Sequence, residues 1–195
     1  MTLYVREKSS NALLSSLLTG EDLARQDGLG RGELLKGVFI KMPPPGAEHG
    51  RIESRIGAYL LNFVEAHDLG EVFVGETGIY TSRNPDTVRG MDVAYISFER
   101  LKHNQSPTYI DVAPELIVEV LSPHNRWSDI YNKVAEYFDI GTDMVWIVDP
   151  QRHELFVYRS LDDILRLTKS GTVTGQDVLP GFELSLAKLF RTRRG

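Results

Sequence analysis

The stretch Leu116-Ile-Val-Glu-Val-Leu121 is apolar throughout except for Glu119. A run of this length and composition is typical of a central strand that is covered on both faces of its sheet. An unpaired ionised carboxylate inside such a strand would cost several kcal/mol, or it would be forced to take up a proton. Glu119 is therefore the first residue of this chain to examine for a chemical role.

The segment after this strand predicts a crossover helix. Ser122-Pro123 ends the strand, apolar residues then recur at helical spacing from Ser128 to Asp139, and Gly141 follows as a stop. Met144 to Val148 is a second buried strand. Because a helix that joins two strands allows them to run parallel in one sheet, we expect strands 116–121 and 144–148 to be parallel neighbours.

The remaining segments add elements on both sides of this unit. We expect one or two small helices within residues 1–32, one of them capped by Thr19 and Asp22, a hairpin or bulged strand over 33–41, and a helix over 49–69 that ends at Gly70. Strands at 71–75, 78–80 and 92–97 form an antiparallel meander with a turn at Asn84-Pro85-Asp86, and later a hairpin of strands 155–159 and 165–169 precedes a helical turn over 184–190. The expected fold is one α/β domain over residues 1–195, a mixed β-sheet flanked by helices, with residues 1–32 as a helical N-terminal extension.

Composition limits the classes of function. The chain has 195 residues, enough for one sizeable core, and a formal charge of −5, which counts mildly against nucleic acid as a ligand. The chain contains no cysteine, so disulfides, thiolate zinc sites and cysteine nucleophiles are excluded. Ser15 and Ser16 interrupt the apolar stretch from Leu13 to Leu18, and no run is long enough to span a membrane. We expect a cytoplasmic protein without membrane contact.

Two strand carboxylates, Asp92 and Glu119, are the candidate metal ligands. A bound cation would remove the cost of burying Glu119, and Mg²⁺ prefers two or three carboxylate oxygens completed by water and a substrate phosphate. A metal at this point could polarise a phosphate and lower the pKa of an attacking water. Lys133 is the third candidate, because it lies on a different face of its helix from Ile130 and Val134.

Several motifs together resemble one known family. They are Pro114-Glu-Leu-Ile-Val-Glu-Val-Leu-Ser-Pro123, Asp129-x-x-x-Lys133 and Val145-Trp-Ile-Val-Asp-Pro150, supported by Gly32-Glu33, His49-Gly50, Gly75-Glu-Thr-Gly78, Asp86-Thr-Val-Arg-Gly90 and Asp177-Val-Leu-Pro-Gly-Phe182. The chain resembles the Uma-type restriction endonuclease family, a large bacterial group long described as a domain of unknown function. The likeness covers nearly the whole chain, and the motifs are specific as a set rather than singly.

The resemblance implies a restriction endonuclease-like fold of the PD-(D/E)XK superfamily, whose active site is an Asp, a Glu and a Lys around Mg²⁺. Asp92 and Glu119 would be the metal carboxylates. Two positions depart from the superfamily pattern: Met91 stands where a proline precedes the Asp, and Leu121 stands where the motif has its lysine. Lys133, from the following helix, is the replacement candidate.

The resemblance also brings Glu33 and His49 toward the same site, Glu33 as a further metal ligand and His49 as a substrate or metal contact. Each candidate has a structural alternative. Asp92 could cap a turn, Glu119 could form an ion pair with an arginine, and Lys133 could pair with Asp129 on the helix surface. Glu33 and His49 could have no chemical role. Four arginines could contact phosphate or lie in solvent: Arg51, Arg55, Arg89 and Arg126.

Two functions remain open. The first is a Mg²⁺- or Mn²⁺-dependent endonuclease that hydrolyses phosphodiester bonds of nucleic acid, DNA in the first place, and acts as a homodimer or higher homo-oligomer. The second is a catalytically silent member of the same fold that binds or regulates a partner. A silent protein would have no reason to retain Glu119 in a strand this apolar, which favours the enzyme.

Overall fold

The computed structural model describes residues 17–26, 28–123 and 125–192. The helices are α1 (Gly20–Arg25), α2 (Ala47–Ala66), α3 (Phe98–Leu101), α4 (Trp127–Asp139) and α5 (Leu186–Leu189). The strands are β1 (Gly32–Leu35), β2 (Val38–Lys41), β3 (Gly70–Ser82), β4 (Thr87–Ser97), β5 (Leu116–Val120), β6 (Met144–Asp149), β7 (Glu154–Tyr158), β8 (Ile164–Leu167), β9 (Thr172–Gly175) and β10 (Leu179–Ser185).

Eight strands form one mixed sheet in the order β2-β1-β4-β5-β6-β7-β8, with β3 also paired to β4. β5 and β6 run parallel, with α4 as the crossover between them, and the other pairs in this sheet are antiparallel. The predicted mixed sheet flanked by helices and the predicted parallel pair are therefore confirmed. β9 and β10 form a separate two-stranded sheet.

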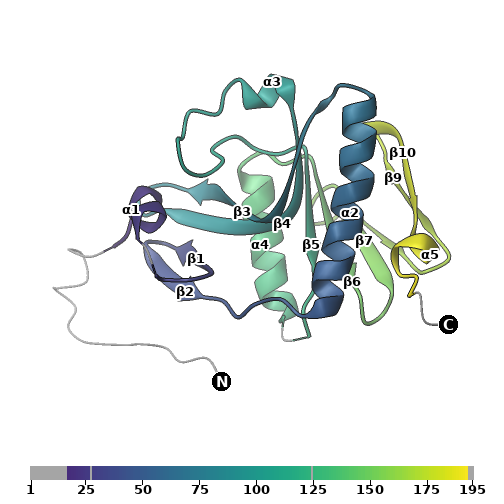
Figure 1. The fold of residues 1–195 in the computed structure, drawn as a ribbon, viewed down its shortest axis with the longest axis horizontal. Coiled ribbons are helices and arrows are strands. Elements are labelled where there is room, and N and C mark those ends of the chain that lie inside the picture. The colour runs from purple at the N-terminus through teal and green to yellow at the C-terminus, as the bar shows by residue number, and fades with distance from the viewer. Residues whose placement is uncertain (1–16, 27, 124, 193–195) are drawn as a thin grey trace.

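The two long helices cover opposite faces of the sheet (Figure 1). The core on one face includes Ile52, Ile56, Leu60 and Val64 of α2. The core on the other face includes Ile130, Val134 and Tyr137 of α4. In β5, Val118 belongs to the first core and Ile117 to the second. Because side chains alternate along a strand, Glu119 points to the same side as Ile117, toward α4.

The three-strand meander predicted between residues 71 and 97 is wrong. The chain instead forms one long hairpin of β3 and β4, turning at the predicted Asn84-Pro85-Asp86. The interruption that suggested two strands is a β-bulge between Val74 and Thr77, where Gly75 and Glu76 have φ values of 78° and 61°. A bulge bends a strand without ending it, which a local sequence pattern does not distinguish from a turn.

Several predicted boundaries also differ. The helix predicted over 49–69 runs from Ala47 to Ala66, and Gly70 begins β3 rather than ending the helix. The helical turn predicted over 184–190 is confined to α5, because Leu184 pairs with Val173 in the β9–β10 hairpin, which was not predicted. The hairpin gave a weak sequence signal because few residues of these short strands are both apolar and buried. Those that are, Val173, Leu179, Phe182 and Leu184, join the same core as the buried residues of α2.

The predicted N-terminal cap is present. Thr19 accepts a hydrogen bond from Asp22 N, and the Asp22 carboxylate accepts one from Thr19 N, so α1 begins with a capping box. Residues 1–16 of the predicted helical extension lie outside the described residues. Among the helices of the described part, none has the length and apolarity needed to cross a membrane.

Candidate metal-dependent active site

Asp92 and Glu119 lie next to each other at the point where the pairing of β4 with β5 ends. Val93 of β4 pairs with Val118 of β5, and Asp92 and Glu119 each lie one residue beyond that pair. Asp92 Oδ2 accepts a hydrogen bond of 2.7 Å from Val120 N, which holds its carboxylate between the strands. Both side chains are buried, at 4% and 6% exposure. The two predicted carboxylates are thus neighbours at an opening in the sheet.

Two donors from α4 hold the Glu119 carboxylate. Tyr137 Oη donates to Glu119 Oε1 at 2.7 Å, and Lys133 Nζ donates to Glu119 Oε2 at 2.8 Å. Burial raises the pKa of Glu119 to about 7, the Lys133 charge opposes this rise, and the Asp92 charge adds to it. A carboxyl group with this pKa exchanges a proton near neutral pH.

Lys133 joins Glu119 to the β1–β2 hairpin. Its Nζ also donates to Gly90 O at 2.9 Å and lies 3.2 Å from Glu33 Oε1. Burial acts to lower the pKa of Lys133, but the charges of Glu119 and Glu33 outweigh it and raise the pKa, so the ammonium stays charged. Within the described residues, Lys133 makes these contacts rather than the surface pair with Asp129.

Glu33 is a second acceptor on the opposite side of Lys133. Glu33 Oε2 accepts from Arg89 Nη1 at 2.9 Å, and Oε1 accepts from Gly90 N at 3.1 Å. Burial acts to raise the pKa of Glu33, but the charges of Lys133 and Arg89 lower it below its usual value. Glu33 is therefore held as a carboxylate that fixes the lysine in place.

His49, at the start of α2, reaches Asp92 from the other face of the sheet. His49 Nε2 lies 3.3 Å from Asp92 Oδ1 and 3.6 Å from Glu53 Oε2, while Nδ1 lies 3.3 Å from Ser122 Oγ. Nε2 is buried and has no hydrogen-bond partner of acceptable geometry in the described structure. Burial acts to lower the pKa of His49, and Asp92, Glu53 and Glu119 together raise it.

His49, Glu53 and Asp92 could hold a metal ion. One ligand atom from each lies within 4.8 Å of the others. The unpartnered Nε2 fits this role, because a ring nitrogen that faces two carboxylates without a hydrogen bond is placed to bind a cation. An oxygen-rich set with one imidazole is compatible with a divalent ion.

Glu53 was missed in the sequence interpretation. It lies four residues after His49, so both side chains share one face of α2. That spacing was the available signal, but Glu53 is otherwise an ordinary helical glutamate. Its position depends on the β3 bulge, since Gly75 N donates to Glu53 Oε1 at 2.8 Å.

The cluster carries a surplus of acidic groups. Its carboxylates are Glu33, Glu53, Asp92, Glu119 and Glu136. Its permanent cations are Lys133 and Arg89, and Arg89 is occupied by Glu33 and by Glu136, which accepts from Arg89 at 2.6 and 2.7 Å. Partly buried carboxylates in excess of cations are unfavourable unless they take up protons or a metal.

A comparison with known protein families shows which family the chain belongs to. The family model Uma2, described as "Putative restriction endonuclease", matches residues 21–187. The chain belongs to the Uma2 family. The predicted family relationship is thereby confirmed, and the match includes every candidate residue from Glu33 to Lys133.

A solved structure shares the fold of this Uma2 chain. It is the crystal structure of a putative nuclease belonging to DUF820 from Anabaena variabilis, with a TM-score of 0.72 and 21% sequence identity, covering 86% of this chain and 94% of the other. At that identity the likeness shows the fold alone. No curated protein matches the chain.

The structure brings all five predicted site residues of this Uma2 protein into one cluster. Their chemical roles stay predictions, and Glu119 lies outside the group of three potential metal ligands. Of the four arginines considered for phosphate, three already have protein acceptors: Arg89 binds Glu33 and Glu136, Arg55 donates to Leu189 O at 2.7 Å, and Arg51 lies 3.3 Å from Glu48. Arg126 is exposed before α4.

Proposed function

We propose that this Uma2 protein is a divalent-metal-dependent nuclease that hydrolyses phosphodiester bonds. One observation carries the proposal: the metal-compatible group His49, Glu53 and Asp92 lies beside the buried pair of Lys133 and Glu119. Metal ligands next to a fixed positive charge are a combination that supports hydrolysis of a phosphodiester. The restriction endonuclease description of the family and the DUF820 neighbour support the same reaction.

His49, Glu53 and Asp92 would hold the cation, with Mg²⁺ and Mn²⁺ as the ions to test. The ion would polarise the phosphate and lower the pKa of a bound water. Glu119 as a further ligand, as predicted from sequence, would use a lone pair that Tyr137 and Lys133 leave free, since each of its oxygens accepts one of these donors. Glu33 is fully engaged by Arg89, Gly90 and Lys133, which suits a supporting role better than direct metal binding.

The protein's own side chains supply the remaining chemistry. The Lys133 ammonium, held between Glu119 and Glu33, is a fixed positive charge beside the proposed metal ligands. A phosphate oxygen would bind it directly by replacing one of its three acceptors, Gly90 O, Glu119 or Glu33. Glu119, with a pKa of about 7, is suited to accept a proton from an attacking water at neutral pH. Tyr137 keeps the Glu119 carboxylate turned toward the lysine.

A catalytically silent binding module is the second candidate, favoured by the formal charge of −5. The choice of DNA over RNA, the homo-oligomeric state, the cytoplasmic location and the single domain over residues 1–195 remain our predictions alongside it. Cleavage alone separates an enzyme from a module.

Two measurements test the proposal. The first is cleavage of supercoiled plasmid and single-stranded DNA in Mg²⁺ or Mn²⁺ by wild type, Asp92→Ala and Glu119→Ala; we expect cleavage by wild type only. The second is thermal unfolding during metal titration, where an ion at 100 times its Kd should add about 2.7 kcal/mol of stability.

Glu53→Gln and His49→Ala should lose this metal-dependent stabilisation, while Glu65→Gln, an exposed change on the same helix, should keep it. Equal stabilisation of all these proteins would rule out the proposed ligand set. Metal binding without cleavage of any nucleic acid would favour the silent module.

A further inference from the structure

A small hollow opens beside the proposed active site, at the carboxyl ends of β5 and β6 and the start of α4. Its volume is about 70 Å³. Pockets that enclose a whole small-molecule ligand are usually about 300–1,000 Å³. The hollow is therefore too small to enclose a free nucleotide, and it could receive only part of one flat group that belongs to a larger bound molecule.

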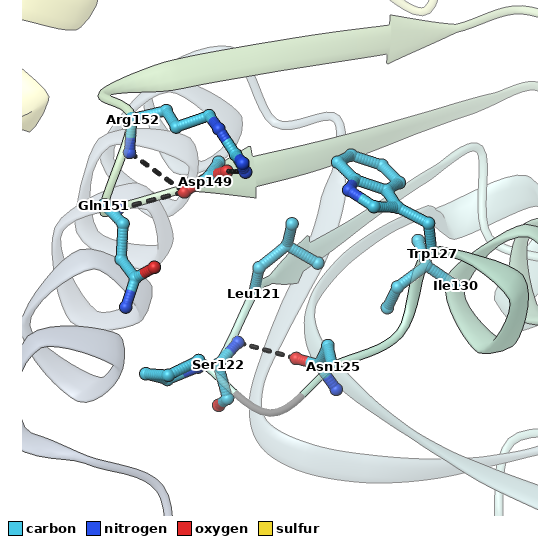
Figure 2. A pocket seen from close by; sticks show the side chains of 9 residues that line it. Leu121, Ser122, Asn125, Trp127, Ile130, Asp149, Gln151 and Arg152 are labelled. Carbon is cyan, nitrogen blue, oxygen red and sulfur yellow. Dashed lines mark hydrogen bonds and ion pairs between the residues drawn. The ribbon is translucent and has the colours of Figure 1, made fainter.

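The walls of the hollow are an aromatic ring and a guanidinium group. Figure 2 shows the Trp127 indole on one side and the Arg152 guanidinium on the other, with Leu121 between them. Trp127 is 46% exposed, although tryptophan is usually buried, and its ring meets Phe156 edge-on at 5.5 Å. Arg152 Nη1 donates to the buried Asp149 at 2.9 Å, which orients its guanidinium. Each flat group has one such partner, and both side chains remain partly open to solvent.

Leu121 links this hollow to the active site. It lies two residues after Glu119, so it points to the same side of the sheet at a distance of about 7 Å along the chain. Leu121 and Ile130 together form the apolar floor of the hollow.

Ser122 provides a second link. Its hydroxyl lies 3.3 Å from His49 Nδ1, and its side chain also lines the hollow. Its backbone N donates to Asn125 Oδ1 at 2.6 Å, which orients the Asn125 amide at the rim. A group in the hollow would therefore be next to the proposed metal ligands.

We propose that the hollow binds an unpaired nucleobase adjacent to the cleaved phosphodiester, so that the substrate is single-stranded nucleic acid or a strand with a base turned out. This inference rests on the proposed nuclease function. A base offers a flat face for stacking on Trp127 and Arg152, and exposed aromatic side chains are a common platform for single strands. In a duplex both faces of each base are already stacked, so a paired base would not enter. Stacking accepts any base, and sequence preference should be weak.

The test measures binding without cleavage, in EDTA, by fluorescence anisotropy of labelled oligo(dT), oligo(dU), oligo(rU) and a DNA duplex. Trp127→Ala should weaken single-strand binding about 5- to 150-fold, the range of one lost base stack. Trp127→Phe should restore most of the affinity. Tyr131→Ala, which removes an exposed aromatic one turn further along α4, should bind as wild type does.

Intrinsic fluorescence gives an independent signal. The chain has two tryptophans, and Trp146 is fully buried, so quenching by a single strand should come from Trp127 and disappear in Trp127→Phe. Equal single-strand affinity of wild type and Trp127→Ala would overturn the proposal, as would tighter binding of the duplex that also depends on Trp127.

The base-binding test and the nuclease test can succeed or fail independently of each other. If Trp127-dependent binding is found without cleavage, the base site stands and the nuclease function fails. If metal-dependent cleavage is found with equal binding by Trp127→Ala, the nuclease function stands and the base site fails. Comparison of oligo(dU) with oligo(rU), which differ only in the sugar, then shows which sugar the site accepts.

Discussion

Replacing Tyr137 by Phe tests whether the Glu119 carboxylate is stabilised by a residue that is not among the five site residues predicted from sequence. The substitution keeps the fully buried ring and removes only the hydroxyl that donates to Glu119 Oε1 at 2.7 Å. Buried hydrogen bonds to a charged group contribute about 1.5–3 kcal/mol. At pH 8, where Glu119 with its pKa of about 7 is mostly ionised, we expect a loss of about that size in the free energy of unfolding.

The loss should depend on pH with a definite sign. The Tyr137 hydrogen bond lowers the pKa of Glu119, so its removal raises that pKa further. Below pH 7 the carboxyl is protonated in both proteins and only a neutral hydrogen bond is lost, worth about 0.5–1.5 kcal/mol. The difference between wild type and Tyr137→Phe should therefore grow as the pH rises through the pKa of Glu119 and shrink below it.

Urea denaturation at pH 5.5 and pH 8 measures both values. Tyr158→Phe is the matched control, because Tyr158 lies buried in the same core and its hydroxyl has no hydrogen bond to a described residue. The reasoning is refuted if Tyr137→Phe costs no more than Tyr158→Phe at pH 8, or if its cost is the same at both pH values. If the protein is active, the acid limb of its rate profile should also move to higher pH in Tyr137→Phe.

Two further predictions concern the other side of Lys133. The pKa of Glu33 is below its usual 4.5, so its contribution to stability is present above that pH and is lost as the pH falls through the folded-state value. The loss of unfolding free energy caused by Glu33→Gln, measured by urea denaturation, should therefore shrink below pH 4.5. Glu71→Gln, at an exposed position of β3, should cause little loss at any pH. Arg89→Met should cost about 3–5 kcal/mol in the same assay, because it leaves the carboxylates of Glu33 and Glu136 without their shared cation. A cost for Arg89→Met within error of zero would show that the pair is no stronger than a surface ion pair.

The local sequence determined the centre of the fold. β5 is apolar except for Glu119, β6 is apolar except for its last residue Asp149, and a helix-length amphipathic segment separates them, so pattern and connection length are sufficient to predict a parallel pair. The same pattern made Glu119 conspicuous, because a buried carboxylate needs partners. Lys133 was found by its helix face and by the family motifs, and its ammonium does reach Glu119.

Only the tertiary structure decided which carboxylates face the histidine. Glu53 looks like any exposed residue of an amphipathic helix, and it becomes a potential ligand because the bulge at Gly75 turns a backbone N–H toward it. Tyr137 lies in the segment 128–139 that was predicted as an amphipathic helix, and its spacing does not indicate that its hydroxyl reaches a strand carboxylate 18 residues earlier in the chain. A sequence pattern reports which face of an element is buried, whereas the atoms that meet there depend on strand register, bulges and the packing of helices against the sheet.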